Sequence, residues 1–325
     1  MSKALPEVSV NSMPSDARIF VTGHRGMVGS ALLRRLQARG YTQVLTRTRA
    51  ELDLLDQAAV YRYLVEHRPD YVFIAAAKVG GILANATERA DFLFQNLQIA
   101  LNLIHGAHRA GIQRLQFLGS SCIYPRDCPQ PIREEFLLSG PLEPTNEPYA
   151  IAKIAGVKLA ESYCRQHGRQ YISVMPTNLY GPGDNYDLQS SHVLPALIRK
   201  AHEAKGRGDA SITVWGSGTP RREFLYVDDL AEACVHLMET GYDGPLINIG
   251  CGEDLSIREL AQTVAEVVGF QGELVFDSSK PDGTPRKLLD ISRLRALGWQ
   301  PRTPLRAGIA ETYAQACAAG FDAPR

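Results

Sequence analysis

The chain has 325 residues, of which 35 are basic and 35 acidic, so its formal net charge is zero. This length can form one large domain or two modest ones, and either arrangement can bury a sizeable core. The balanced charge excludes a global attraction to nucleic acid or to an anionic membrane, and we expect neither as a partner. Any charged ligand must therefore be recognised by a local group of side chains.

The cysteine pattern and the apolar runs indicate a reducing, aqueous compartment. The six cysteines show no paired C-x-x-C spacing, and a chain of this size needs no disulfide framework. The longest apolar runs, such as residues 72–77, have the length of a strand and are far too short to span a membrane. We therefore expect a soluble, cytoplasmic protein without a metal site.

The chain begins with a leader, a strand, a glycine-rich turn and a helix. Residues 1–17 mix proline, serine, asparagine and charge without the apolar core of a signal peptide, and we interpret them as a loose leader. Residues 18–22 are a short β-rich run, residues 23–29 a turn, and residues 30–37 have helical periodicity.

The same alternation continues through the first half of the chain. Strands are predicted near 43–46 and at 71–75, 115–119 and 171–175, and helices from 57, over about 88–109 and over 149–166. Repeated strand and helix units predict a parallel sheet covered on both faces. The expected fold class is α/β, with a Rossmann-type, doubly wound parallel sheet.

Beyond residue 183 the pattern loosens into polar loops that predict a smaller, discontinuous α/β domain. Helix candidates cover residues 192–204, 256–268 and 304–318. The strand candidates at 223–227 and 246–250 resemble the earlier sheet, so we expect the chain to cross back there. The predicted domains are residues 18–180 with about 223–251 for a cofactor, and about 181–222 with 252–325 for a substrate.

The glycine-rich turn predicts a dinucleotide site. Its three glycines have the spacing G-x-x-G-x-x-G directly after the first strand, where glycine lets the backbone approach a pyrophosphate at the N-terminus of the next helix. A bare strand-to-helix turn is the alternative, but the position within a βα series favours the cofactor. The predicted contacts are Gly23, His24, Arg25, Gly26, Met27, Val28 and Gly29.

The end of the second strand predicts which dinucleotide binds. NAD enzymes tend to place an acidic residue there, whereas this chain has Arg47 and Arg49, with Arg25 already in the glycine turn. Guanidinium groups bind phosphate bidentately, which favours NADP(H) through its 2′-phosphate. A solvated basic loop is the alternative, and Glu51 and Asp53 leave use of both cofactors open.

Three residues are arranged for work on a ketone. Tyr149 and Lys153 lie one helical turn apart, so the ammonium group can lower the pKa of the phenol and ready it for proton transfer. A Y-x-x-x-K pattern alone is common in helices. Here it follows a strand that ends before Ser120, whose hydroxyl can share a carbonyl oxygen with Tyr149. This trio is typical of the extended short-chain dehydrogenase/reductase superfamily.

Cys122 and His192 are candidates for a second kind of chemistry. A cysteine is often a buried filler and a histidine often a solvated or capping group. A thiolate and an imidazole have pKa values on either side of neutrality, however, and protons beside a ketone are acidic. The pair could therefore remove and return such protons, which predicts an epimerase and a reductase in one site.

The sequence resembles the GDP-L-fucose synthase family, whose members are GDP-4-keto-6-deoxy-D-mannose 3,5-epimerase/4-reductases. The resemblance extends from residue 21 to about residue 313. It rests on long segments at residues 23–30, 75–81, 118–125, 142–156, 176–182, 214–219 and 280–287.

The resemblance implies a role for each candidate residue. Tyr149 would protonate the C4 oxygen, Lys153 would tune it and touch the nicotinamide ribose, and Ser120 would polarise the ketone. Cys122 would be the base and His192 the acid for inversion at C3 and then C5. Beside the glycine turn and the two arginines, the implied NADP(H) contacts are Leu118, Gly119, Ser120, Ser121, Lys153, Pro176, Thr177, Asn178, Leu179 and His192. The implied GDP-sugar contacts are Lys200, Trp215, Arg222 and Asp282.

The resemblance also implies a homodimer, formed by the helix over about 88–109 and the Tyr149 helix as a four-helix bundle. The chain departs from the family pattern at Tyr226, where the family has histidine, and at residues 241–244, where the family has a longer insertion. Two alternatives remain open: a GDP-mannose 3,5-epimerase with retained NAD, which Arg47 and Arg49 disfavour, and a non-catalytic NADP-sensing protein, which the intact catalytic residues disfavour.

Overall fold

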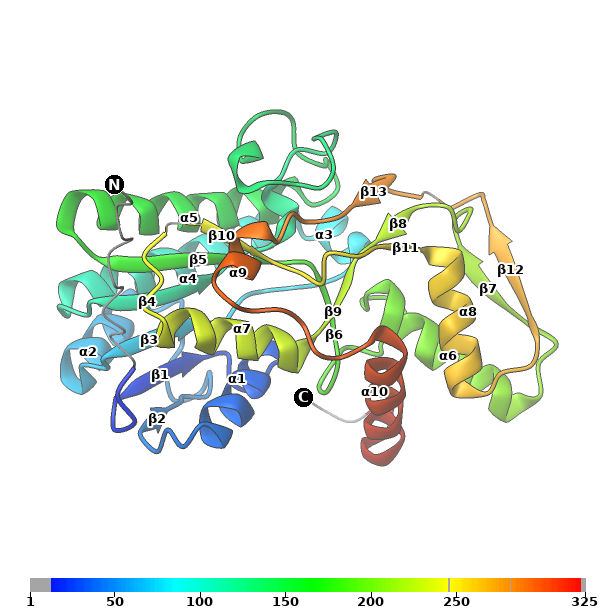
Figure 1. Ribbon diagram of the computed structural model, residues 1–325, viewed down its shortest axis with the longest axis horizontal. Coiled ribbons are helices and arrows are strands. Elements are labelled where there is room, and N and C mark those ends of the chain that lie inside the picture. Colours follow the sequence, from blue (N-terminus) through cyan, green and yellow to red (C-terminus); the bar gives the residue numbers. More distant parts are fainter. Residues whose placement is uncertain (1–12, 245, 281, 323–325) are drawn as a thin grey trace, which may run out of the picture.

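A six-stranded parallel sheet forms the centre of the larger lobe of the molecule (Figure 1). The computed structural model describes residues 13–244, 246–280 and 282–322. The strand order is β10-β5-β4-β3-β1-β2, and every neighbouring pair is parallel. The strands are β1 (Ile19–Thr22), β2 (Val44–Leu45), β3 (Tyr71–Ile74), β4 (Arg114–Leu118), β5 (Gln170–Pro176) and β10 (Leu246–Ile249). The predicted α/β class and Rossmann-type sheet are confirmed.

Helices cover both faces of this sheet because its strands are apolar on both sides. In β1, Ile19 and Val21 pack into one core cluster and Phe20 into another, as the two-residue period of a strand requires. The first cluster lies under α1 (Met27–Ala38) and α7 (Val227–Glu239). The second lies under α2 (Gln57–His67), α4 (Arg89–Arg109) and α5 (Glu147–His167).

The smaller lobe has its own core, at the right of Figure 1. Its helices α6 (Val193–Arg207), α8 (Ile257–Val268) and α10 (Leu305–Ala319) pack with the parallel pair β7 (Ser211–Trp215) and β12 (Glu273–Asp277). Short strands join the two lobes. They are β6 (Asn178–Tyr180) with β9 (Phe224–Tyr226), and β8 (Arg221–Arg222) between β11 (Leu255–Ser256) and β13 (Arg286–Lys287).

The remaining elements are short. They are helices α3 (Ile82–Thr87) and α9 (Ser292–Ala296) and the 3₁₀ turns η1 (Ser121–Ile123) and η2 (Glu134–Phe136). Turn η1 follows β4 at the carboxyl end of the sheet, and α3 follows β3 in the same region.

Two expectations from the sequence need correction. The run at 223–227 does not stay extended to its end, because β9 stops at Tyr226 and the unpredicted helix α7 begins at Val227. Residues 1–12 of the expected leader lie outside the described residues, but its last part is not loose. Met13 and Ala17 are each 4% exposed in the core cluster under α1 and α7, and the Tyr41 hydroxyl donates to the Met13 carbonyl at 3.3 Å.

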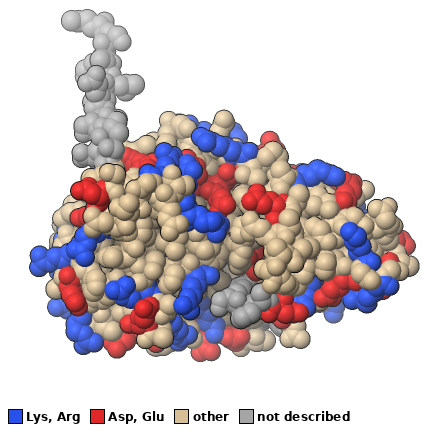
Figure 2. All heavy atoms as spheres, turned by 90° about the horizontal axis from the view of Figure 1, so that it is seen from below, with Lys and Arg blue, Asp and Glu red and all other residues tan. Residues whose placement is uncertain are grey.

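Charge is mixed in sign on the face of the molecule that Figure 2 shows. On the face shown in Figure 2, basic and acidic side chains are interspersed and form no broad field of one sign. Within the described ranges, no helix has the length and apolar character needed to cross a membrane.

Candidate active site

The candidate residues gather where the strands of the large sheet end. In open parallel sheets, ligands bind outside the carboxyl ends of the strands. The glycine turn follows β1, Ser120 follows β4, and Thr177 follows β5. Helix α5 lies beside η1 and carries Tyr149 and Lys153 near its N-terminal end.

The turn after β1 requires glycine at two positions. Gly23 has a φ of 69°, and a Cβ there would lie 2.8 Å from the backbone of Ala76. A Cβ at Gly29 would lie 2.1 Å from the Gly23 carbonyl oxygen. Helix α1 begins directly behind the turn with no acidic residue in its first turn and no side-chain cap at Gly26. The predicted residues 23–29 thus form a cradle that fits a pyrophosphate.

The predicted arginines lie beside this cradle. The Arg47 guanidinium is 5.0 Å from the centre of the Tyr63 ring and donates to the Thr46 carbonyl at 2.7 Å. Arg49 is exposed and 3.9 Å from Asp53. Arg25 is also exposed at the glycine turn. Three cations near the end of β2 suit a phosphate on the ribose.

The acidic residue in this region is already engaged. The Glu51 carboxylate accepts hydrogen bonds from the Thr48 amide at 2.7 Å and from the Thr48 hydroxyl at 2.8 Å. These bonds lower the pKa of Glu51, and the charges of Arg47 and Arg25 add to the effect. Glu51 therefore fixes its own loop, and its charge faces the same arginines that would hold a phosphate.

Ser120, Tyr149 and Lys153 come together as predicted. Ser120 caps η1, and its hydroxyl accepts a hydrogen bond from the Cys122 amide at 3.2 Å. It also forms a hydrogen bond with the Tyr149 side chain. Lys153 is 4% exposed, donates to the Leu118 carbonyl at 2.7 Å, and lies 5.7 Å from the centre of the Tyr149 ring.

The electrostatics of this trio correct one expectation. Burial raises the pKa of Tyr149, the charge of Cys122 adds to the rise, and the hydrogen bond with Ser120 opposes it. Burial also lowers the pKa of Lys153 to about 7. The pKa of Tyr149 therefore lies above its usual value and not below it, because burial outweighs the opposing hydrogen bond. The phenol consequently keeps its proton, as a proton donor must.

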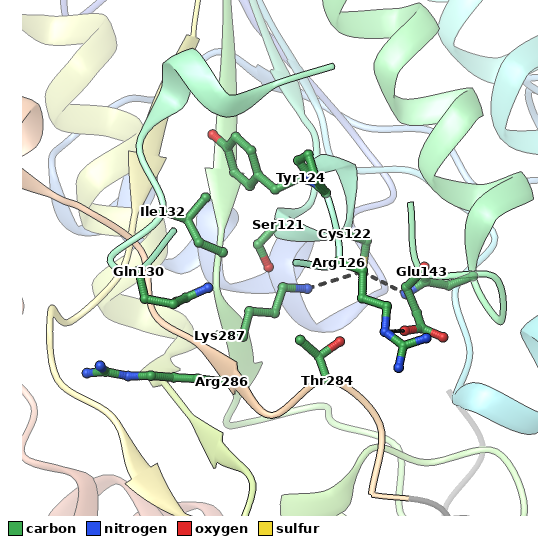
Figure 3. Close-up of a pocket in the computed structure, with 12 residues that line it drawn as sticks. Ser121, Cys122, Tyr124, Arg126, Gln130, Ile132, Glu143, Thr284, Arg286 and Lys287 are labelled. Carbon is green, nitrogen blue, oxygen red and sulfur yellow. Dashed lines mark hydrogen bonds and ion pairs between the residues drawn. The ribbon is translucent and has the colours of Figure 1, made fainter. Parts of the chain in front are cut away.

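Cys122 lies in a small cavity at the N-terminal end of α5 (Figure 3). The Asn146 side-chain amide donates to the Cys122 sulfur at 3.3 Å, and the Lys287 ammonium lies 3.6 Å from it. The cavity is lined by Ser121, Cys122, Tyr124, Pro125, Arg126, Gln130, Ile132, Glu143, Asn146, Thr284, Arg286 and Lys287. A polar, cationic cavity argues against the simple filler role for this cysteine.

His192 occupies the N-cap position of α6 and is exposed. The loop before it is attached to the large lobe, because the Gly81 amide donates to the Ser190 carbonyl at 2.9 Å. Its role as the acid opposite Cys122 stays a prediction.

The stretch implied for the nicotinamide is fixed by Glu223. The Thr177 hydroxyl donates to the Glu223 carbonyl at 3.3 Å and the Asn178 side chain donates to it at 2.8 Å. The Glu223 carboxylate accepts from the Gly252 amide at 2.6 Å and the Leu289 amide at 3.1 Å. Pro176 ends β5 and Leu179 lies in β6. Burial raises the pKa of Glu223, while these amides lower it.

The four residues implied for the GDP-sugar form two pairs in the smaller lobe. The Lys200 ammonium lies 5.4 Å from the Trp215 ring centre, and this indole is 60% exposed. Arg222 is close to Asp282, which accepts from the Ser217 amide at 2.7 Å. Burial lowers the pKa of Arg222, and the charge of Asp282 opposes this.

Three residues near these groups were missed by sequence reasoning. Lys280 lies 5.5 Å from the Trp215 ring centre, on the indole that Lys200 also faces. Asn146 and Lys287 contact Cys122. All three lie in segments that carry the family resemblance, and this location was the only feature of the sequence that could have marked them as candidates.

The comparisons place this fold and site in a class. Residues 19–250 match the model of the NAD dependent epimerase/dehydratase family, and the chain belongs to that family. It is 58% identical to GDP-L-fucose synthase of Escherichia coli (strain K12) over 92% of this chain and 96% of that one. It is 57% identical to GDP-L-fucose synthase 1 of Arabidopsis thaliana over 94% and 95%. Within the wider family, the chain is a member of the GDP-L-fucose synthase group.

A solved structure agrees with this assignment. A GDP-L-fucose synthetase from Naegleria fowleri bound to NADP superposes with a TM-score of 0.88 at 30% identity, covering 97% of this chain and 98% of that one.

Proposed function

We propose that this enzyme converts GDP-4-keto-6-deoxy-D-mannose to GDP-L-fucose, by 3,5-epimerisation followed by NADPH-dependent reduction of the C4 ketone. The observation that carries the proposal is the position of Cys122 beside the Ser120, Tyr149 and Lys153 trio. A plain carbonyl reductase has no use for a thiol there. High identity to GDP-L-fucose synthases over nearly the whole chain supports the same two reactions.

In the epimerisation, Cys122 removes the proton from C3 and later from C5. The electron pair of the broken C–H bond moves to the C4 oxygen, where hydrogen bonds from Ser120 and Tyr149 stabilise the enolate. His192 returns a proton from the opposite face, which inverts the carbon.

In the reduction, Tyr149 donates its proton to the C4 oxygen. Its raised pKa keeps the phenol protonated until charge develops on that oxygen. NADPH supplies the hydride for C4 when it is bound. Lys153, with its pKa lowered to about 7, can hold or release a proton near neutrality and so can help reprotonate the tyrosine.

The residues present fit NADP(H). The cradle at residues 23–29 would hold the pyrophosphate through backbone amides, and Arg25, Arg47 and Arg49 would hold the 2′-phosphate. The nicotinamide end would lie along Gly119, Ser121 and residues 176–179, at the ends of β4 and β5.

The smaller lobe would hold the GDP-sugar. Arg222 forms no ion pair within 4.0 Å among the described residues, so the diphosphate would supply its counter-charge. Trp215 offers an exposed ring for stacking, with Lys200 beside it. Asp282 would contact the nucleotide from the same turn. This division corresponds to a cofactor domain of residues 18–180 with about 223–251, and a GDP-sugar domain of about 181–222 with 252–325.

The functional unit that we propose is a homodimer formed by α4 and α5. These two helices pack against each other and carry apolar side chains that remain exposed, among them Phe94 at 60%, Leu101 at 39% and Ile151 at 44%. Covering such a face is a common reason for association. A cytoplasmic location is part of the same proposal and agrees with six free cysteines. Sedimentation would test the dimer.

The test of function is a single reaction with two readouts. The enzyme is mixed with freshly made GDP-4-keto-6-deoxymannose, the NADPH absorbance is followed, and the sugar product is identified, with NADH in a parallel cuvette. NADPH loss with GDP-L-fucose as product is expected from wild type and from the control Tyr61→Phe on α2, but not from Tyr149→Phe. No NADPH loss, with deuterium still entering the sugar, would favour an epimerase that retains its NAD.

A further inference from the structure

Two polar side chains from distant parts of the chain contact the Cys122 sulfur. Asn146 donates a hydrogen bond to it at 3.3 Å, and Lys287 places an ammonium group 3.6 Å away. Asn146 is also the N-cap residue of α5, so the sulfur lies at the positive end of a 21-residue helix. Figure 3 shows the Lys287 side chain extending toward Cys122 from the segment that carries Thr284 and Arg286.

The charges of the neighbouring cations are already compensated, whereas that of Lys287 is not. Arg126 pairs with Glu143 at 3.5 Å, and Arg286 pairs with Asp254 at 2.5 Å. Lys287 forms no ion pair within 4.0 Å in the part of the chain that the structure describes, and its contact is with the sulfur of Cys122. A thiolate would be the counter-ion that this ammonium lacks.

Two further titratable groups face this pair. The thiol of Cys128 has its pKa raised by burial, with the charge of Lys287 opposing the rise. The pKa of Tyr149 is raised by burial and then by the charge of Cys122. A charged Cys122 therefore also helps Tyr149 to stay protonated during the epimerisation.

The backbone that carries Lys287 is fixed on both sides. Strand β13 pairs with β8, and the next residues are tied to the large lobe. The Leu288 amide donates to the Gln130 side chain at 2.8 Å, and the Ile132 amide donates to the Leu288 carbonyl at 2.7 Å. The Leu289 amide donates to Glu223. These bonds fix the backbone position from which the Lys287 side chain extends toward Cys122.

We propose that Lys287 is a positioning residue that holds Cys122 as a thiolate ready to remove the sugar protons, with Asn146 orienting the sulfur. This deepens the function proposed above and rests on it. The thiolate takes the proton from C3 or C5, an S–H bond forms as the C–H bond breaks, and the electron pair passes to the C4 oxygen. Lys287 keeps its proton throughout. The thiol and His192 then exchange protons with solvent before the next inversion.

The test compares Lys287→Met, Lys287→Gln and Lys287→Arg in the full-length, NADP-bound enzyme. The pH profile of Cys122 alkylation by iodoacetamide is measured by mass spectrometry, with the exposed Cys317 as internal reference. Deuterium entry at C3 and C5 is measured in parallel. The matched control is Lys205→Met, which removes an exposed lysine on α6 that donates to the Val268 carbonyl at 2.8 Å.

The methionine and glutamine variants should move the midpoint of Cys122 alkylation upward by about one pH unit or more. Deuterium entry at pH 7 should fall about tenfold or more and recover at higher pH, while Lys287→Arg and Lys205→Met stay close to wild type. Alkylation profiles that match wild type in both uncharged variants would overturn the proposal. Wild type that neither exchanges deuterium nor oxidises NADPH would instead overturn the proposed function, and the alkylation profiles would still decide the Lys287 pair.

Discussion

Replacing Lys153 by methionine should stabilise the cofactor-free protein, although it removes a residue placed in the active site. Lys153 is 4% exposed, and burial lowers its pKa from 10.5 to about 7. A shift of this size penalises the charged form in the folded state by about 4 kcal/mol at pH 7. Methionine fills a similar volume without a charge, but it leaves the Leu118 carbonyl without its partner, which costs about 1–3 kcal/mol. The expected net gain is therefore about 1–3 kcal/mol.

The pH dependence of this gain identifies its origin. The pKa of Lys153 is lower in the folded than in the unfolded chain, so the penalty is complete below about pH 7 and disappears as the pH rises toward 10.5. The wild type should therefore approach the variant in stability as the pH rises. Between pH 7 and pH 9, the difference between them should shrink by about 2 kcal/mol.

Urea unfolding at several pH values measures this difference directly. The control is Lys158→Met on the same helix, because Lys158 is exposed and pairs with Glu161 at 2.8 Å. Its effect should remain within about 0.5 kcal/mol at each pH. If the difference between wild type and Lys153→Met does not change with pH, the ammonium of Lys153 is not desolvated and the reasoning fails.

Three more substitutions test other parts of the site. Gly29→Ala should destabilise by about 1–3 kcal/mol and weaken NADPH binding, since its Cβ would lie 2.1 Å from the Gly23 oxygen. Gly206→Ala, in open space within α6, should instead stabilise by about 0.5–1 kcal/mol, and thermal melts distinguish the two. Arg47→Ala with Arg49→Ala should weaken NADPH by about 2–3 kcal/mol more than NADH in titrations; equal weakening would exclude 2′-phosphate recognition. Cys122→Ser should bind NADPH normally but lose deuterium exchange at C3 and C5, and retained exchange would remove Cys122 from the mechanism.

The parts of the site that the sequence predicts well are those set by local chain geometry. The glycine spacing after β1 follows from the close approach at Gly29. The one-turn separation of Tyr149 and Lys153 follows from helical periodicity, and both residues lie on α5 as expected. The position of Ser120 follows from the end of β4. Each of these relations is contained within a few residues of sequence.

The contact between Cys122 and Lys287 could not be predicted in this way. The two residues are separated by 165 positions, and β13, which carries the lysine, has two residues and therefore no periodicity to read. The direction of the Tyr149 pKa shift was missed for a related reason. The main cause of the shift is burial, which depends on the packing of the whole site. The spacing between Tyr149 and Lys153 in the sequence indicates only that a positive charge is nearby.

The start of helix α7 was missed because it directly follows a sequence typical of a strand. Residues 223–227 are rich in β-forming side chains, but Asp228 and Asp229 follow at once and suit the first turn of a helix. The strand β9 therefore ends at Tyr226 without an intervening loop. Burial of nearly the whole apolar face of α7, in the core cluster that it shares with α1 and the large sheet, then decides the structure.

Glu223 forms hydrogen bonds to segments that serve both the epimerisation and the reduction. Its carbonyl oxygen holds Thr177 and Asn178, next to where hydride transfer would take place, and its carboxylate holds Leu289, two residues after Lys287. A change at Tyr149 or at Lys287 should affect one chemical step more than the other. A change at Glu223 would displace both the Thr177 and Asn178 segment and the segment that carries Lys287. It should therefore impair the epimerisation and the reduction together.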